Sequence, residues 1–169
     1  MSDAASSRDS AFWRFSLSFY ALPEVASSCI ELQDKAGVDV NLMLFLLFLA
    51  NDNHTVTKDD VARLDAAIAP WRNDVVIPLR DLRRRLKGGI GSIPASESEG
   101  FRNMVKRVEL EAERLEQSRL EREAAKFAAT ETSREAAAKI NLAAYAAHLG
   151  QFPATPAKII LDAFTTSAR

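Results

Sequence analysis

A cluster of polar side chains surrounds one predicted turn between two helices. It contains Gln33 and Asp34 before the turn, and Asp39 and Asn41 after it. Carboxylate and amide oxygens are ligands of hard cations such as Mg²⁺, and together with Trp13 they could line a small-molecule site. The spacing matches no metal-binding motif, however, and Asp39 stands where a helix cap is expected. A ligand site at these five residues is therefore the alternative interpretation of the sequence.

A basic stretch is the second candidate. Residues 71–87 carry six basic and two acidic side chains, whereas residues 24–60 carry seven acidic and two basic ones. In one interpretation the basic helix is solvated or packs near the acidic segment. Arg80 or Arg84 would then pair with Asp34, whose charge is unfavourable at a helix C-terminus. In the other interpretation, the stretch docks an acidic protein partner through Arg80, Arg83, Arg84, Arg85 and Lys87. Nucleic acid fits less well, since no recognition motif or interleaved aromatic accompanies the patch.

No arrangement of residues predicts catalysis. Cys29 falls on an apolar helix face, and the two histidines, His54 and His148, have no serine or cysteine motif beside them. The glycine-rich residues 88–92 lack the Lys-Ser/Thr pair of a phosphate-binding loop. One cysteine excludes an intrachain disulfide and argues against a zinc site. We therefore expect no metal and no cofactor, and we favour a non-enzymatic protein while leaving catalysis open.

Composition sets the class of protein. The chain has 169 residues, is 47% hydrophobic and carries a net charge of −1, which is typical of an ordinary soluble domain. The longest apolar run, residues 42–50, is shorter than the roughly 20 residues of a membrane span. The first eleven residues lack the pattern of a secretory signal. These features predict a cytoplasmic protein without a membrane span.

The hydrophobic pattern predicts an all-α fold, because apolar residues recur at intervals of three and four. Near the N-terminus, Phe12, Phe15 and Phe19 form one stripe, and Trp13, Leu17 and Tyr20 form the next, so a broad aromatic face is expected in the core. Pro78 should kink or divide its helix, and Pro70 should end one or start the next. Caps are expected at Asp39, Thr57, Thr132 and Thr155. Helices are expected near residues 9–21, 23–36, 39–51, 57–70, 71–87, 97–127 and 132–150, and from 155 onward.

The glycine-rich segment 88–96 is the clearest predicted hinge. It suggests two domains: a compact orthogonal bundle over residues 1–90, and a long helix with further helices over residues 91–169. The helix at 97–127 carries a narrow apolar stripe: Phe101, Met104, Val105, Val108, Ala112 and Leu115. It is either a solvated helix held by ion pairs such as Arg107 with Glu111 and Arg119 with Glu123, or an arm that pairs with another chain, including a second copy.

Two segments resemble a known family. Residues 12–20 read FWxFSLxxY, and residues 32–45 read LQDxxGxDVNLxLF. This pattern is similar to that of an uncharacterised bacterial family of small cytosolic proteins, with the similarity covering roughly residues 11–90. The resemblance implies an all-α fold and a bacterial origin, and it assigns no activity or catalytic residue.

The sequence thus favours a non-enzymatic interaction or regulatory protein of the bacterial cytosol, similar in role to an adaptor. It would dock its partner through the basic helix and the charged helix at 97–127. The alternative is a helical sensor or enzyme that binds a small molecule or metal near Gln33, Asp34 and Asn41.

Overall fold

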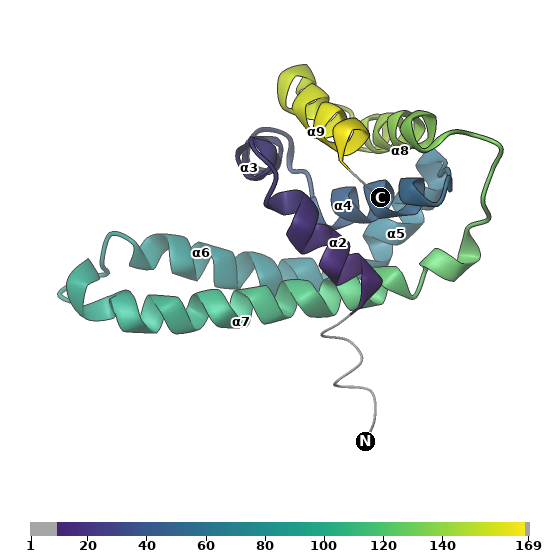
Figure 1. The fold of residues 1–169 in the computed structure, drawn as a ribbon. Coiled ribbons are helices and arrows are strands. Elements are labelled where there is room, and N and C mark those ends of the chain that lie inside the picture. Colours follow the sequence, from purple (N-terminus) through teal and green to yellow (C-terminus); the bar gives the residue numbers. More distant parts are fainter. Residues whose placement is uncertain (1–9, 168–169) are drawn as a thin grey trace. The chain divides into compact units, whose positions relative to one another are not determined.

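The computed structural model describes residues 10–167, and within that range all regular structure is helical (Figure 1). The predicted all-α fold is therefore confirmed. The helices are α2 (Ala11–Tyr20), α3 (Val25–Ala36), α4 (Val40–Asn51), α5 (Lys58–Trp71), a π-helix (Arg72–Val76), α6 (Ile77–Leu86), α7 (Ala95–Glu121), a 3₁₀ turn (Ala124–Lys126), α8 (Arg134–Leu149) and α9 (Ala154–Thr166).

The helices form two compact units. The first consists of the residues up to Asp65 together with those from Gln117 onward, and the second spans Ala66–Glu116. Both boundaries fall inside helices, because α5 and α7 each contribute to both units. The division into domains at residue 90 that the sequence suggests stays a prediction.

The core of the first unit is built around α4. This helix is apolar on every side, and it is buried among neighbours: α8 packs along α4, and α9 packs along α3 (Figure 1). Phe12 of α2 is fully buried, with its ring 5.3 Å from that of Phe45. The broad aromatic face expected on α2 is only partly correct, because Leu17 is 52% exposed and Tyr20 is 37% exposed. A ten-residue helix on the edge of a core has one buried face, and the phenylalanine stripe occupies it.

Two polar side chains of α8 bind the backbone beside α4. Asn141 is fully buried; its Nδ2 donates to the carbonyls of Leu46 (2.9 Å) and His54 (3.0 Å), and its Oδ1 accepts from Val56 N–H (2.8 Å). The Tyr145 hydroxyl accepts from Asp39 N–H at 2.8 Å. The bonds to His54, Val56 and Asp39 satisfy backbone groups outside the helices that have no helical partner.

Helix starts follow local side-chain chemistry in two predicted places. Asp39 caps α4 by accepting from Leu42 N–H at 2.8 Å. Thr57 and Asp60 cap α5 reciprocally: Thr57 Oγ1 accepts from Asp60 N–H (3.1 Å), and Asp60 Oδ2 accepts from Thr57 N–H (3.0 Å). The shorter aspartate therefore serves where a capping box usually has glutamate.

Three predictions about helix ends are wrong. Ser133 rather than Thr132 caps α8, because the serine has the extended backbone that a cap requires and accepts from Ala136 N–H. Thr155 lies inside α9, which begins at Ala154. Pro70 lies inside α5 and does not end it. The chain instead widens into the π-helix, which places Pro78 in the first turn of α6, where a missing N–H costs little.

Glu123 of the first unit collects three cations. Its carboxylate accepts from Lys126 Nζ (2.6 Å), from Arg119 and from Arg63 Nη1 (3.3 Å), and its side chain is only 6% exposed. The ion pair with Arg119 was predicted from the sequence. The Lys126 hydrogen bond and then the Arg119 hydrogen bond hold the pKa of the Glu123 carboxyl below its ordinary value, although burial opposes them.

We expect Glu123 to make the first unit sensitive to acid. A carboxyl whose pKa is lower in the folded than in the unfolded state stabilises the fold above its unfolded pKa, and this contribution disappears as the pH falls through its folded pKa. Because Lys126 and Arg119 are about half exposed, the contribution is about 1 kcal/mol or less. Between about pH 5 and pH 3, Glu123→Gln should therefore lose less unfolding free energy than the wild type.

Denaturant titrations across this pH range measure the effect. Glu131→Gln, a change at an exposed position of the same unit, is the control and should follow the wild type. Identical pH profiles for wild type and Glu123→Gln would contradict the assignment. High salt should reduce the difference, because solvent reaches the cationic partners.

Candidate protein-binding surface

The second unit contains a hairpin of two helices, α6 and α7, which lie side by side (Figure 1). Buried positions of α7 recur at intervals of three and four and include Val105, Glu109 and Ala112. The Trp71 Nε1 donates to the Ala112 carbonyl at 2.9 Å, which holds the start of the hairpin against the middle of α7. This buried line is the side of α7 that packs against the end of α5 and against α6.

A buried carboxylate joins the two helices. Glu109 is 5% exposed and forms a two-pronged contact with the Arg83 guanidinium, whose Nη2 donates to Glu109 Oε1 at 3.0 Å. Arg80 Nε lies 3.5 Å from Glu109 Oε1, and Arg80 Nη2 donates to Glu113 Oε1 at 3.0 Å. Two of the five predicted docking residues are thus engaged in ion pairs within the hairpin. The pairing of Arg80 or Arg84 with Asp34 stays a prediction.

The segment 88–96, predicted as a hinge, includes the tight turn at the tip of this hairpin. Ile90 and Ile93 exchange backbone hydrogen bonds of 2.9 and 3.1 Å across it. Gly89 has a φ of +80°, and a Cβ there would lie 2.8 Å from the Ile93 carbonyl oxygen, so the turn requires glycine. Ile90 and Ile93 are 46% and 55% exposed, and the tip therefore presents apolar surface.

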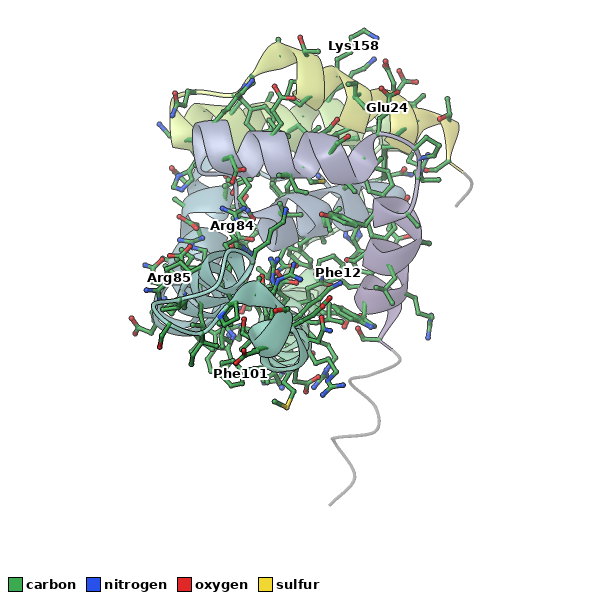
Figure 2. The ribbon with its side chains drawn as sticks, turned by 90° about the vertical axis from the view of Figure 1, so that its left-hand side faces the viewer. Phe12, Glu24, Arg84, Arg85, Phe101 and Lys158 are labelled. Carbon is green, nitrogen blue, oxygen red and sulfur yellow. The ribbon has the colours of Figure 1, made fainter. Side chains whose placement is uncertain are left out.

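The three remaining basic candidates, Arg84, Arg85 and Lys87, are exposed at the end of α6. In Figure 2, which looks along the hairpin from its tip, Arg85 of α6 lies at the left of the hairpin and Phe101 of α7 lies at its lower end. Arg85 and Lys87 make no ion pair within residues 10–167.

Large apolar side chains line one exposed side of α7. Phe101 is 51% exposed, Met104 48%, Val108 54% and Leu115 44%; we call these four residues the α7 stripe. The stripe predicted from the sequence also included Val105 and Ala112, and this is wrong, because those two are 6% and 4% exposed and belong to the buried line. The α7 helix therefore has two apolar lines, one buried and one open to solvent.

Glu111 interrupts the α7 stripe between Val108 and Leu115. The predicted pair of Arg107 with Glu111 is wrong, because Glu111 binds Arg114, whose Nε lies 2.9 Å from Glu111 Oε2. Arg114 is nearly buried, and the hydrogen bond to Glu111 raises the pKa of its guanidinium. Arg107 is exposed and makes no ion pair within the described part of the chain.

The residues of the alternative ligand site have varied surroundings. Asp39 is buried as the cap of α4, and Asn41 is buried with its Oδ1 accepting from Gln117 Nε2 at 2.8 Å. Gln117 was not identified from the sequence. Its side-chain oxygen is buried without a hydrogen-bond partner. The only feature of the sequence that could have identified Gln117 is that a polar residue falls on the buried side of a helix.

The other three members belong to α2 and α3. Trp13 and Gln33 are half-buried, and Asp34 is exposed at the end of α3. The Gln33 backbone carbonyl accepts from Gly37 N–H at 3.1 Å, which closes the helix. A binding role for these residues stays a prediction.

Few other side chains offer chemistry. Burial raises the pKa of the Cys29 thiol to about 12, so the nucleophilic thiolate is scarce at neutral pH. His148 Nε2 lies 3.1 Å from Asp65 Oδ2, and its ring stacks on Tyr145. Over residues 10–167 no group of three or more His, Cys, Asp or Glu side chains could hold a metal ion. None of the described helices is long and apolar enough to cross a membrane.

These features define an all-helical protein with a buried helical core in one unit and an open apolar stripe in the other. A family model described as "Protein of unknown function (DUF2390)" matches residues 11–120, and the chain belongs to this family. Comparisons with curated proteins and with solved structures found no match. The family match ends within α7, so α8 and α9 lie outside it.

Proposed function

We propose that the protein is a non-enzymatic interaction protein, with a regulatory or adaptor role, whose α6–α7 hairpin binds a partner protein with an acidic surface. One observation supports this most directly. The α7 stripe leaves four large apolar side chains about half exposed on a single side of one helix. Scattered apolar residues are common on protein surfaces, but several exposed apolar side chains aligned on one side of a helix are typical of an interaction site.

The charges of the hairpin support an acidic partner. Arg85 and Lys87 are exposed cations at the end of α6, and Arg107 is an exposed cation beside the α7 stripe. Arg80 and Arg83 bind Glu109 and are better assigned to holding the hairpin together. Charge reversal at those two positions would disturb the fold, so Arg85 and Lys87 are the appropriate positions for testing docking.

Site-specific photo-crosslinking in cells tests the proposal. Phe101, at the start of the α7 stripe, is replaced by the photo-crosslinker benzoylphenylalanine, and linked proteins are identified by mass spectrometry. Leu110 provides the matched control, because it is 48% exposed on the same helix but lies on another side of it. We expect an acidic protein to be linked from position 101 and not from position 110.

Charge reversal adds a second criterion. Arg85→Glu combined with Lys87→Glu should lower the crosslinking yield about tenfold. Reversal of two exposed lysines of the first unit, Lys58 and Lys158, changes the net charge equally and should leave the yield unchanged. Equal links from positions 101 and 110, no link from position 101, or a link only to a second copy of the chain would each contradict the proposal.

A further inference from the structure

We infer that the α7 stripe binds a single amphipathic helix of the partner, whose apolar residues recur every three and four positions and whose edges carry carboxylates. This inference rests on the proposed function and specifies what occupies the hairpin. It follows from the spacing of the stripe, from its area, and from the charge at one of its edges.

The spacing of the α7 stripe is that of a helix-pairing surface. Phe101, Met104, Val108 and Leu115 follow one another at intervals of three, four and seven residues, which is a heptad pattern with Glu111 at the remaining position. Fourteen residue steps of an α-helix span about 21 Å. A partner helix of about four turns would cover this length with anchors at matching intervals.

The area of the stripe fits one helix better than a second copy of the chain. Four side chains that are each about half exposed present on the order of 300 Å² of apolar surface. A stable protein–protein interface needs roughly 800 Å² from each partner. A helix-in-groove contact can be smaller and transient, whereas self-association through this stripe alone would be weak.

One edge of the stripe is basic. Arg107 lies three residues after Met104 and is exposed, so it borders the stripe on one side of α7. Arg85, near the end of α6, is another exposed cation of the hairpin. Glu111, within the line of the stripe, is already bound by Arg114.

This edge selects the partner by charge. Residues that flank a helix-pairing surface set the choice of partner, because opposite charges attract across it and like charges repel. Carboxylates on the incoming helix would face Arg107, the exposed cation beside the stripe. In an antiparallel pair of two copies, by contrast, the arginine edges would face each other.

Two synthetic helical peptides of about 20 residues test the inference against the full chain. Both have apolar residues at the same heptad positions; one carries glutamates at the flanking positions, and the other carries lysines. Fluorescence anisotropy of the labelled peptides should show about tenfold tighter binding of the glutamate peptide at about 20 mM salt. At about 500 mM salt the difference should shrink to about twofold.

Matched variants locate the binding surface. Val108→Asp should weaken the glutamate peptide about tenfold, whereas Leu110→Asp, which changes an equally exposed residue outside the stripe, should not. Arg107→Glu should abolish the preference for the glutamate peptide. Lys106→Glu changes the net charge equally at the neighbouring residue, which lies on the opposite side of α7 from the stripe, and should preserve the preference.

The outcomes separate the inference from the proposed function. Equal binding of both peptides would overturn the inference while leaving the hairpin as a binding surface. If neither peptide bound, although photo-crosslinking from position 101 identified an acidic partner, the helical occupant would be wrong and the proposed function would stand. Dimerisation of the chain in light scattering that Val108→Asp abolished would assign the stripe to a second copy and overturn both.

Discussion

Replacing Asn141 by leucine is expected to lower the unfolding free energy of the first unit by about 2–4 kcal/mol. Leucine has nearly the same size and favours helix more strongly, yet it removes all three hydrogen bonds of the amide. Leu46 lies inside α4, where its carbonyl keeps a helical partner, but Val56 N–H and the His54 carbonyl are left unpaired. A buried unpaired backbone group costs about 1–3 kcal/mol.

The two tryptophans allow this effect to be measured in one unit at a time. Trp13 belongs to the first unit and Trp71 to the second, so a Trp71→Phe background reports the first unit through Trp13 fluorescence during denaturation. Ala143→Leu, at an exposed position of α8, controls for helix propensity and should stay within about 0.5 kcal/mol of the parent.

Hydrogen exchange provides an independent measurement. Val56 precedes α5 and has no helical hydrogen bond, so its amide protection depends on the Asn141 carboxamide. That amide should exchange faster in Asn141→Leu, relative to amides in the middle of α4. Unchanged stability together with unchanged protection of Val56 would show that these backbone groups do not depend on Asn141.

Features governed by neighbouring residues could be predicted from the sequence. The apolar surface of α4 required helices on all sides, and Asp39 preceded that helix with the side chain and position of a cap. Thr57 and Asp60 likewise identified the start of α5. These predictions needed only helical periodicity and the chemistry of unpaired backbone groups, which act within a few residues.

The surface of the hairpin could not be predicted in the same way. On α7 the two apolar lines lie close together around the helix, and periodicity alone merged Val105 and Ala112 with the exposed residues. What distinguishes the lines is a tertiary contact: Glu109 belongs to the buried line because Arg80 and Arg83 reach it from α6. The sequence did contain one usable signal: Glu109 lies at helical spacing from Val105 and Ala112. A charged side chain on a buried side of a helix needs a partner of opposite charge.

The side-chain amide of Asn141, in the first unit, is a similar case of a polar group on a buried side of a helix. Asn141 falls in the same stripe as Ala138, Leu142 and Tyr145, where a polar residue is out of place unless it binds backbone. The sequence could therefore have identified it as a buried hydrogen-bonding residue. It could not have identified Val56 or His54 as the partners, because they lie some 85 residues away along the chain.

Glu109→Leu is expected to destabilise the hairpin by about 2–4 kcal/mol, which is the second large effect. The substitution leaves Arg83 without the carboxylate that binds two of its nitrogens, and leaves Arg80 with Glu113 alone. Removing one member of a buried ion pair is costly because the remaining charge is poorly solvated. The arginines keep 18% and 25% of their side-chain exposure, so the cost should fall below that of a fully buried pair.

Trp71 fluorescence in a Trp13→Phe background reports this effect, because the Trp71 indole donates to the Ala112 carbonyl of α7. Glu99→Leu, an exposed change on the same helix, should leave the transition midpoint nearly unchanged. Adding Arg83→Leu to Glu109→Leu should recover part of the loss, because the double variant no longer contains the guanidinium that Glu109 bound. If Glu109→Leu matched the wild type, the ion pairs would not be what holds α6 to α7. Arg80 and Arg83 would then be available for docking, as the sequence first suggested.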